Sequence, residues 1–190
     1  MRPAIGTVGL PRHFDEIMPE PIPPLILTLQ MEEDTFLRFE ELRRRHFPET
    51  LNKIPAHATL FHALPGEEEA GITDTIDGLA RAMKPVDVSV TGLRFTGRGV
   101  AFVLDCEALS AFRARLASAF EQWLTPQDRQ GWRPHVTVQN KVEPETARTL
   151  QADLERDFVP FRFTASGVLL WRYLGGPWEP RAALLFGGSR

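Results

Sequence analysis

The stretch AHATL at residues 56–60 decides the fold, because a stretch of the same kind, PHVTV, recurs at residues 134–138. Both contain the pattern His-x-Thr-x, in which x is apolar, close behind a proline. Side chains alternate between the two faces of a β-strand, so the histidine and threonine of each stretch should share one face. The apolar residues should then face a core, which leaves an imidazole and a hydroxyl on the open side.

The segments on either side of these two stretches follow one order of strands and helices. Hydrophobic residues that alternate or recur at helical spacing, with prolines and glycines between them, indicate the element boundaries. The predicted strands are 25–30, 56–64, 86–95, 99–106, 132–142, 160–174 and 181–186, and the predicted helices are 34–47, 72–83, 109–123 and 144–154. The strands 86–95 and 99–106 are predicted to form a hairpin across the glycines between them.

Simple spacing supports an internal duplication. The first strand precedes its histidine by 57 − 25 = 32 residues, and Phe102 precedes the second histidine by 135 − 102 = 33. The two histidines are 135 − 57 = 78 residues apart, and Gly92 and Gly167 are 167 − 92 = 75 apart. One offset therefore nearly superimposes both landmarks, which is typical of a repeated unit.

Composition restricts the class of protein. The chain of 190 residues carries 22 Lys+Arg against 25 Asp+Glu, so no global basic field would hold long nucleic acid. Six prolines within residues 1–24 predict an extended arm, followed by one domain over residues 25–190. The single cysteine, Cys106, is expected in the core, and it cannot form an intramolecular disulfide, which favours a cytoplasmic setting. No apolar run reaches the roughly 20 residues that cross a bilayer, so no membrane association is expected.

Two His-x-Thr-x strands that face one cleft have a definite chemistry. A neutral imidazole can accept a proton near neutral pH, and a protonated one can donate it to a leaving group. Threonine hydroxyls can donate hydrogen bonds to the oxygens of a phosphoryl group. We therefore predict that His57 and His135 are catalytic, and that Thr59 and Thr137 bind phosphate.

These residues, within IPAHATL and RPHVTVQNKV, resemble the two-histidine (2H) phosphoesterases, and among them the bacterial 2′-5′ RNA ligases or RNA 2′,3′-cyclic phosphodiesterases. The resemblance extends over about residues 25–186. It implies a bilobal α+β fold with two pseudo-symmetric halves, each an antiparallel sheet with helices on its outer face, and a cleft between them. It also implies cleavage of a cyclic phosphodiester without metal or other cofactor.

One departure concerns the residues behind the second motif. RNA-processing members of the family often have an arginine there, whereas this chain has Gln139, Asn140 and Lys141. Gln139 has the same parity as His135, so it is a candidate for contact with phosphate or sugar, and Lys141 could supply positive charge.

Several other residues could have either a functional or a structural role. His62 lies five residues after His57, on the opposite face of a regular strand, and is predicted to be structural, which disfavours a metal site formed by the two. The run of arginines at 43–45 ends a helix and is expected to be a solvated face, although RNA contact is the alternative. The aromatic residues 171, 173 and 178 could stack on a base or simply pack in the core or hairpin.

The function predicted from these features is hydrolysis of the 2′,3′-cyclic phosphate of an RNA end or of a small cyclic nucleotide. The pseudo-symmetry leaves open which histidine is the base. The reverse reaction, with a 5′-hydroxyl in place of water, would give ATP-independent 2′-5′ RNA ligation. The alternative is a non-catalytic RNA- or nucleotide-binding module of the same fold. No obligate protein partner is indicated.

Overall fold

The computed structural model describes residues 22–188 of the chain. Apart from its last three residues, the predicted N-terminal arm lies outside the described residues. The elements are β1 (Leu25–Met31), α1 (Glu33–His46), the 3₁₀ turn η1 (Glu49–Leu51), β2 (Thr59–Leu64), η2 (Gly66–Glu68), α2 (Glu69–Arg81), β3 (Val86–Phe95), β4 (Val100–Asp105), α3 (Glu107–Ala119), η3 (Glu121–Trp123), β5 (His135–Gln139), α4 (Pro144–Arg156), β6 (Phe161–Tyr173) and β7 (Trp178–Leu185). The predicted order of strands and helices is confirmed.

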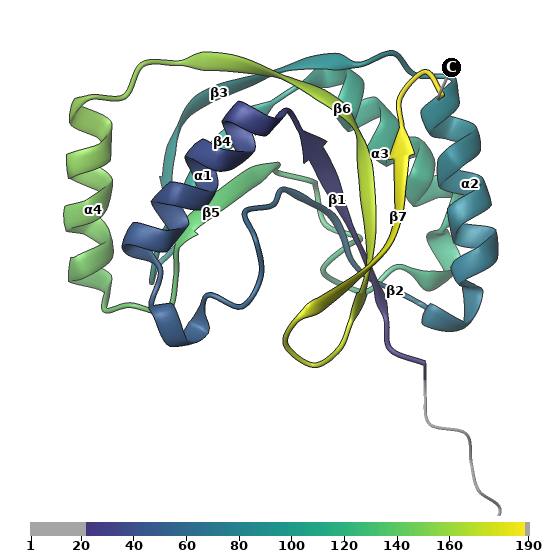
Figure 1. Ribbon diagram of the computed structural model, residues 1–190, viewed down its shortest axis with the longest axis horizontal. Helices are drawn as coiled ribbons and strands as arrows, with labels where there is room; N and C mark the ends of the chain where they lie inside the picture. The colour runs from purple at the N-terminus through teal and green to yellow at the C-terminus, as the bar shows by residue number, and fades with distance from the viewer. Residues whose placement is uncertain (1–21, 189–190) are drawn as a thin grey trace, which may run out of the picture.

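All seven strands belong to one antiparallel sheet (Figure 1). The strand order is β2-β1-β6-β3-β4-β5, and β7 pairs with β6. The two strands that carry the His-x-Thr-x stretches, β2 and β5, are thus the two ends of this order. The sheet curls into a half-barrel, and the Trp132 indole N–H from the segment before β5 reaches the carbonyl of Thr59 in β2 at 2.9 Å. Curling therefore brings the segment before β5 within hydrogen-bond distance of β2, at the other end of the strand order.

The strand order agrees with the predicted duplication. Exchanging β1 with β4, β2 with β5 and β3 with β6 turns the order into its own reverse, which is the same sheet. The α+β class is confirmed, whereas the division into two lobes stays a prediction.

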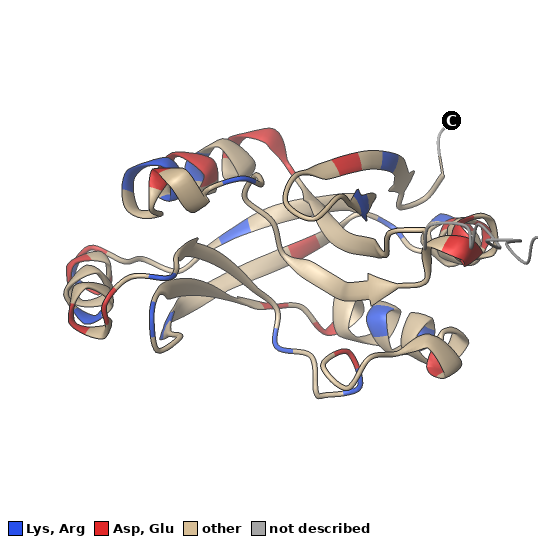
Figure 2. Ribbon diagram, turned by 90° about the horizontal axis from the view of Figure 1, so that it is seen from below, with Lys and Arg blue, Asp and Glu red and all other residues tan. Residues whose placement is uncertain are grey.

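The helices form two groups beside the sheet. In Figure 1, α1 and α4 lie on one side of the molecule, and α2 and α3 lie on the other. The charged residues of the described chain lie mostly on the helices and connections, while the strands are largely uncharged (Figure 2). Buried apolar side chains from the strands and helices form the core, and Cys106 packs against it partly buried. None of the helices in residues 22–188 is long and apolar enough to cross a membrane.

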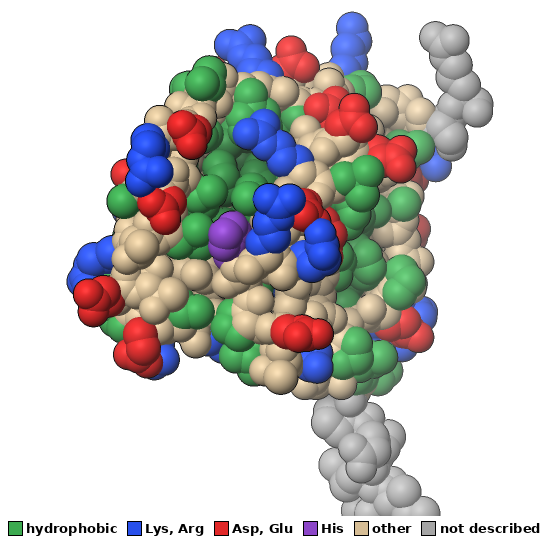
Figure 3. Space-filling model, turned by 60° about the vertical axis from the view of Figure 1, so that its left-hand side comes forward, with side chains coloured by type: hydrophobic (Ala, Val, Ile, Leu, Met, Phe, Trp, Pro, Cys, Tyr) green, Lys and Arg blue, Asp and Glu red, His purple; other side chains and the backbone are tan. Residues whose placement is uncertain are grey.

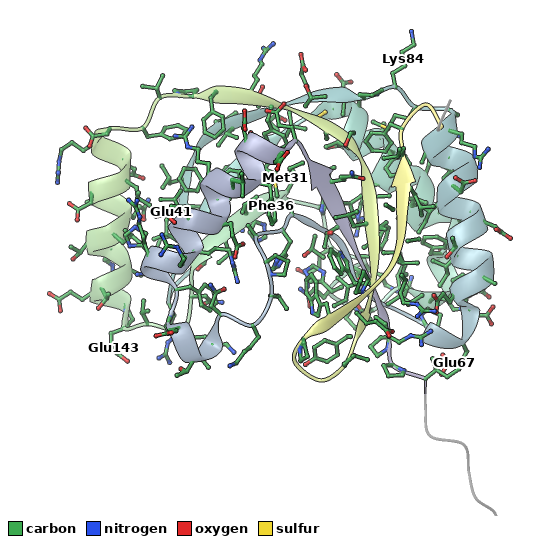
Figure 4. All side chains as sticks on the ribbon, in the orientation of Figure 1. Met31, Phe36, Glu41, Glu67, Lys84 and Glu143 are labelled. Atoms are coloured by element: carbon green, nitrogen blue, oxygen red, sulfur yellow. The ribbon has the colours of Figure 1, made fainter. Side chains whose placement is uncertain are left out.

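An apolar hollow lies between α1 and α4. Leu42, Phe102, Leu154 and Phe158 form part of its lining, and charged side chains surround the hollow on this face (Figure 3). Figure 4 shows Glu41 on α1 and Glu143 beside the start of α4. None of the residues that line this hollow belongs to the two His-x-Thr-x stretches.

Local sequence explains the connections nearest to β5. The β3-β4 hairpin turns at Gly97, whose φ of 90° is readily available only to glycine, and the Thr96 N–H donates to the Gly99 carbonyl at 3.0 Å. Gly99 cannot be larger, because a Cβ there would lie 1.9 Å from the carbonyl oxygen of Gln139. The hairpin therefore fixes the end of β5 by close backbone contact.

Candidate active site

The two predicted catalytic histidines are held in the same way. His135 is the first residue of β5, and His57 lies two residues before the start of β2, so the predicted strand 56–64 begins later than expected. The Nδ1 atom of His57 donates to the carbonyl of Pro55 at 2.7 Å, and that of His135 donates to the carbonyl of Arg133 at 2.8 Å. A carbonyl can only accept, so Nδ1 carries the proton and Nε2 is left free for chemistry in both rings.

Arg43 ties the two His-x-Thr-x segments together. Its guanidinium donates to the carbonyl of Thr137 at 2.8 Å, to the side-chain oxygen of Asn52 at 2.8 Å and to the carbonyl of Ile54 at 3.2 Å. Only 2% of Arg43 is exposed. The prediction that the arginine run is a solvated face is therefore wrong for Arg43, because the helix turns this one position inward.

Arg44 and Arg45 do fit the prediction of a solvated face. Both are exposed, and both pair with Glu41 on the same helix. A sequence pattern with three adjacent arginines cannot separate the inward residue from its neighbours unless the helix register is known.

A β-bulge follows the threonine in each of the two strands. In β2, Thr59 pairs with Thr28 and Phe61 pairs with Leu27, so β2 has one extra residue between Thr59 and Phe61. As a result Leu60 and Phe61 are both buried, and the alternation of faces is shifted by one. His62 therefore returns to the face of Thr59, and its prediction as an opposite-face residue is wrong.

The second bulge lies at the equivalent position of β5. Thr137 pairs with Ala101 and Gln139 pairs with Val100, so Val138 and Gln139 are both buried. The two bulges are 137 − 59 = 78 residues apart, the same offset as the two histidines. Gln139 lines a cavity beside α4, so the parity argument that grouped it with His135 is wrong.

The other predicted contact residue, Lys141, lies just beyond β5. It is exposed and has a φ of 61°, and it is not among the residues that line the cavity next to His135. A role for Lys141 at the rim stays a prediction. The bulge instead makes Asn140 the equivalent of His62, since 62 + 78 = 140.

A cavity of about 270 Å³ adjoins His135 and includes Thr59 in its wall. We call it the His135 cavity; its lining residues are Thr59, Leu60, His62, Arg94, Arg113, Gln127, Asp128, Gln130, Gly131, Trp132, Arg133 and His135. Sheet register explains the presence of Arg94, because Arg94 pairs with Ala101 and Ala101 pairs with Thr137. Directly paired residues project to one face, so Arg94 shares the face of Thr137.

The opposite side of the site is aromatic. The rings of His57 and Trp178 are 4.7 Å apart between centroids, and those of Trp178 and Trp171 are 6.0 Å apart. The indole N–H of Trp171 donates to the hydroxyl of the buried Thr28 at 2.9 Å. Trp171 is thus fixed as part of the wall, and Trp178 confines the His57 ring. Tyr173 is exposed.

Burial and positive charge both favour the neutral form of the two histidines. Burial lowers the pKa of His57 to about 4, and the charges of Arg43, His135 and His62 contribute in the same direction. Burial also lowers the pKa of His135, with a further contribution from Arg94 and His62.

The sequence did not identify Arg94, Trp132 and Asp128 as residues of the site, nor the buried position of Arg43. Arg94 alone had a usable signal, because it alternates with apolar residues along β3 and precedes a hairpin. Within residues 22–188, no group of three or more His, Cys, Asp and Glu side chains is arranged to hold a metal ion.

The fold and the two His-x-Thr-x stretches are those of the two-histidine (2H) phosphoesterase class. Residues 31–177 match the 2′-5′ RNA ligase superfamily, to which the chain belongs. The crystal structure of TT0787 from Thermus thermophilus is similar, with 17% identity, a TM-score of 0.59, and coverage of 88% of this chain and 100% of that one. No curated protein sequence matches the chain.

LigT of E. coli has a similar fold in two complexes. The complex with 3′-AMP has a TM-score of 0.59 at 16% identity and covers 88% of this chain and 99% of LigT. The complex with NADP+ has a TM-score of 0.56 at 16% identity and covers 89% of this chain and 100% of LigT. At these identities the likeness shows the common fold.

Proposed function

We propose that this protein hydrolyses a 2′,3′-cyclic phosphodiester, at an RNA end or on a small nucleotide, to a phosphomonoester. The observation that carries this proposal is the matched pair of histidines, each with Nδ1 on the carbonyl two residues upstream and Nε2 free. Acid-base cleavage of a phosphodiester needs two such groups, one for the nucleophile and one for the leaving oxygen. We also infer that the site lies between two lobes related by the duplication.

The surroundings of the two histidines support one assignment of their roles. His57 has a pKa of about 4 and packs on Trp178, so it is neutral at pH 7 and suits the general base. Its Nε2 takes a proton from water as the water oxygen bonds to phosphorus. His135 suits the general acid, because the negative phosphate would raise its pKa on binding and its Nε2–H can protonate the departing ribose oxygen.

The two threonines, together with Arg43 and Trp132, complete the site. The hydroxyls of Thr59 and Thr137 would hold the non-bridging phosphoryl oxygens, which carry the charge that develops during the reaction. Arg43 and Trp132 fix the distance between the strands that bear the two histidines. Proximity of this kind can contribute several kcal/mol to lowering a barrier, roughly 7 or more in well-oriented systems.

Nucleotide complexes of a protein with the same fold favour a nucleotide substrate here. LigT binds 3′-AMP, ATP and NADP+ in its crystal structures. The tryptophans 171 and 178 offer a surface on which a base could stack. The superfamily also favours ligation as a second activity, since a 5′-hydroxyl could replace water in the reverse reaction at the same two histidines.

The test is hydrolysis of adenosine 2′,3′-cyclic phosphate with EDTA present, followed by separation of 2′- and 3′-AMP. The wild type should turn over, and His57→Ala and His135→Ala should each lose at least about 10²-fold in kcat. His46→Ala is the matched control, because His46 lies at the end of α1 and lines a different cavity.

Three outcomes would reject this proposal. Turnover retained in both histidine variants would remove the site, and loss of turnover with EDTA would indicate a metal-dependent hydrolase. Failure of the wild type to cleave cyclic nucleotides or cyclic-ended RNA, with nucleotide binding intact, would favour the non-catalytic module.

A further inference from the structure

A third histidine faces the His135 cavity and is held by a buried carboxylate. The Nδ1 atom of His62 donates to Asp128 Oδ1 at 2.8 Å. Asp128 is 1% exposed and also accepts from the backbone N–H groups of His62 and Ala63 and from the hydroxyl of Thr125. The carboxylate fixes the ring orientation, and the His62 side chain remains 43% exposed, with its Nε2 edge free.

Asp128 is itself firmly anchored. Burial alone would raise the pKa of Asp128, but hydrogen bonds from the ring and backbone of His62 outweigh that effect and keep the pKa below its usual value. The Arg113 guanidinium donates to the Asp128 carbonyl and, at 3.4 Å, to that of Leu60. The loop before β5 is therefore bound to β2 through His62, a histidine that has no role in the proposed reaction.

The cavity beside this histidine is positively charged. Arg94, Arg113 and Arg133 line it against a single carboxylate, Asp128, which leaves 3 − 1 = 2 net positive charges before any proton on His62. None of the ion pairs within residues 22–188 uses Arg94 or Arg133. Two arginines without a carboxylate partner, next to an oriented imidazole, are suited to an anion.

This charge lies to one side of the scissile phosphate position. Thr59 and His135 are shared between the cavity and the proposed reaction centre, whereas His57 and its tryptophan wall are not among the cavity residues. Arg113 and Arg133 lie toward the loop 127–133, whereas Arg94 lies two strands from Thr137 on the same face of the sheet. A substrate with only one phosphate would leave them without a partner.

We propose that His62, Arg94 and Arg133 form a second anion subsite that binds a phosphate other than the scissile one. This inference rests on the proposed function and narrows its substrate class to cyclic phosphodiesters with a second phosphate. That group can be the 5′-phosphate of a mononucleotide or the next phosphodiester of an RNA end. His62 acts here as a substrate-binding residue, and Asp128 is the positioning residue behind it.

The experiment compares kcat/KM for three substrates. These are adenosine 2′,3′-cyclic phosphate, its 5′-phosphorylated form, and the dinucleotide ApA with a 2′,3′-cyclic end. The wild type should prefer a substrate with a second phosphate by about tenfold or more, mainly through KM, because charge-assisted hydrogen bonds form to that group. The substrate whose kcat/KM exceeds that of adenosine 2′,3′-cyclic phosphate identifies the source of the second phosphate.

Substitutions assign the preference to residues. His62→Ala and Arg94→Ala should each lower the preference for a second phosphate. The ratio of kcat/KM for the preferred substrate to kcat/KM for adenosine 2′,3′-cyclic phosphate should then approach one. Asp128→Asn should reduce the ratio partly, because the ring loses its charged partner. His46→Ala should leave the ratio at the wild-type value.

Binding separates this inference from the proposed function. Calorimetry with adenosine 3′,5′-bisphosphate and 3′-AMP measures the subsite even if no substrate turns over, and the bisphosphate should bind about tenfold more tightly to the wild type but not to His62→Ala or Arg94→Ala. Equal affinities for both ligands in the wild type, or a preference that survives both substitutions, would overturn the subsite. Failure of turnover alone, with the binding preference intact, would overturn only the proposed reaction.

Discussion

Replacing Arg43 with alanine should both destabilise the protein and slow catalysis. Arg43 is nearly fully buried, and its guanidinium serves three acceptors, the carbonyls of Thr137 and Ile54 and the side chain of Asn52. These acceptors lie on β5 and on the segment that leads to His57. Without the guanidinium, its three hydrogen bonds between β5 and the segment before His57 are lost.

The size of the effect follows from the three acceptors. A buried acceptor left without a donor costs about 1 kcal/mol or more, so the loss is about 3 kcal/mol for the set. In a chain of this length, each kcal/mol lowers Tm by about 2–4 °C, which predicts a fall of about 6–12 °C. A displacement of about 1 Å between the catalytic groups costs about 10²-fold, so kcat should fall by about 10- to 100-fold.

The assay is calorimetric unfolding together with kcat on a cyclic nucleotide, measured well below the Tm of the variant. Arg44→Ala is the matched control, because the Arg44 side chain is 72% exposed and its pair with Glu41 lies at the surface, where solvent screens it. Arg43→Lys should resemble Arg43→Ala, since one ammonium cannot reach three separated acceptors. If Arg43→Ala and Arg44→Ala had equal Tm and equal kcat, the role assigned to Arg43 would be refuted.

Three further predictions concern pH, an indole and two glycines. Because burial lowers the pKa of both proposed catalytic histidines, kcat/KM should peak below pH 6.5 and fall on the acid side near pH 4. Calorimetric stability should decrease as the pH falls from about 6.5 to 4, because His57 of the unfolded chain takes up a proton that the folded ring excludes; an NMR titration of His57 with a pKa of 6.5 would contradict both expectations. Trp132→Phe leaves the Thr59 carbonyl without its donor and should cost about 1–3 kcal/mol in chemical denaturation, whereas an unchanged midpoint would show that this bond does not hold the strands. Gly99→Ala should destabilise by about 1–3 kcal/mol because its Cβ meets a carbonyl, while Gly92→Ala, with nothing within 4 Å, should be neutral or slightly stabilising; equal melting temperatures would argue against the close contact.

Much of the fold could be predicted because its signals are local. Strand and helix periodicity, the glycines of the β3-β4 hairpin and Pro144 at the start of α4 all act within a few residues. The same locality placed the histidine and threonine of each motif on one face. The strand order also agrees with the predicted duplication, since the two strands that carry the motifs are equivalent ends of one sheet.

The errors arose where strand alternation was extended past the bulges. His62 and Gln139 were placed by counting from His57 and His135, and one extra residue in each strand reversed the count. Nothing in either stretch marks the extra residue, because a bulge depends on how the neighbouring strand pairs. Arg43 was misjudged for a similar reason, since its acceptor on Thr137 lies 94 residues away.

The order of elements and the two His-x-Thr faces follow from the sequence, because hydrophobic periodicity and turn residues act over short distances along the chain. The contact of Trp132 with β2, the place of His62 in the cavity and its bond to Asp128, 66 residues away, come from the tertiary fold. Those contacts depend on strand register and on the curl of the sheet, which are set by the packing of the whole core.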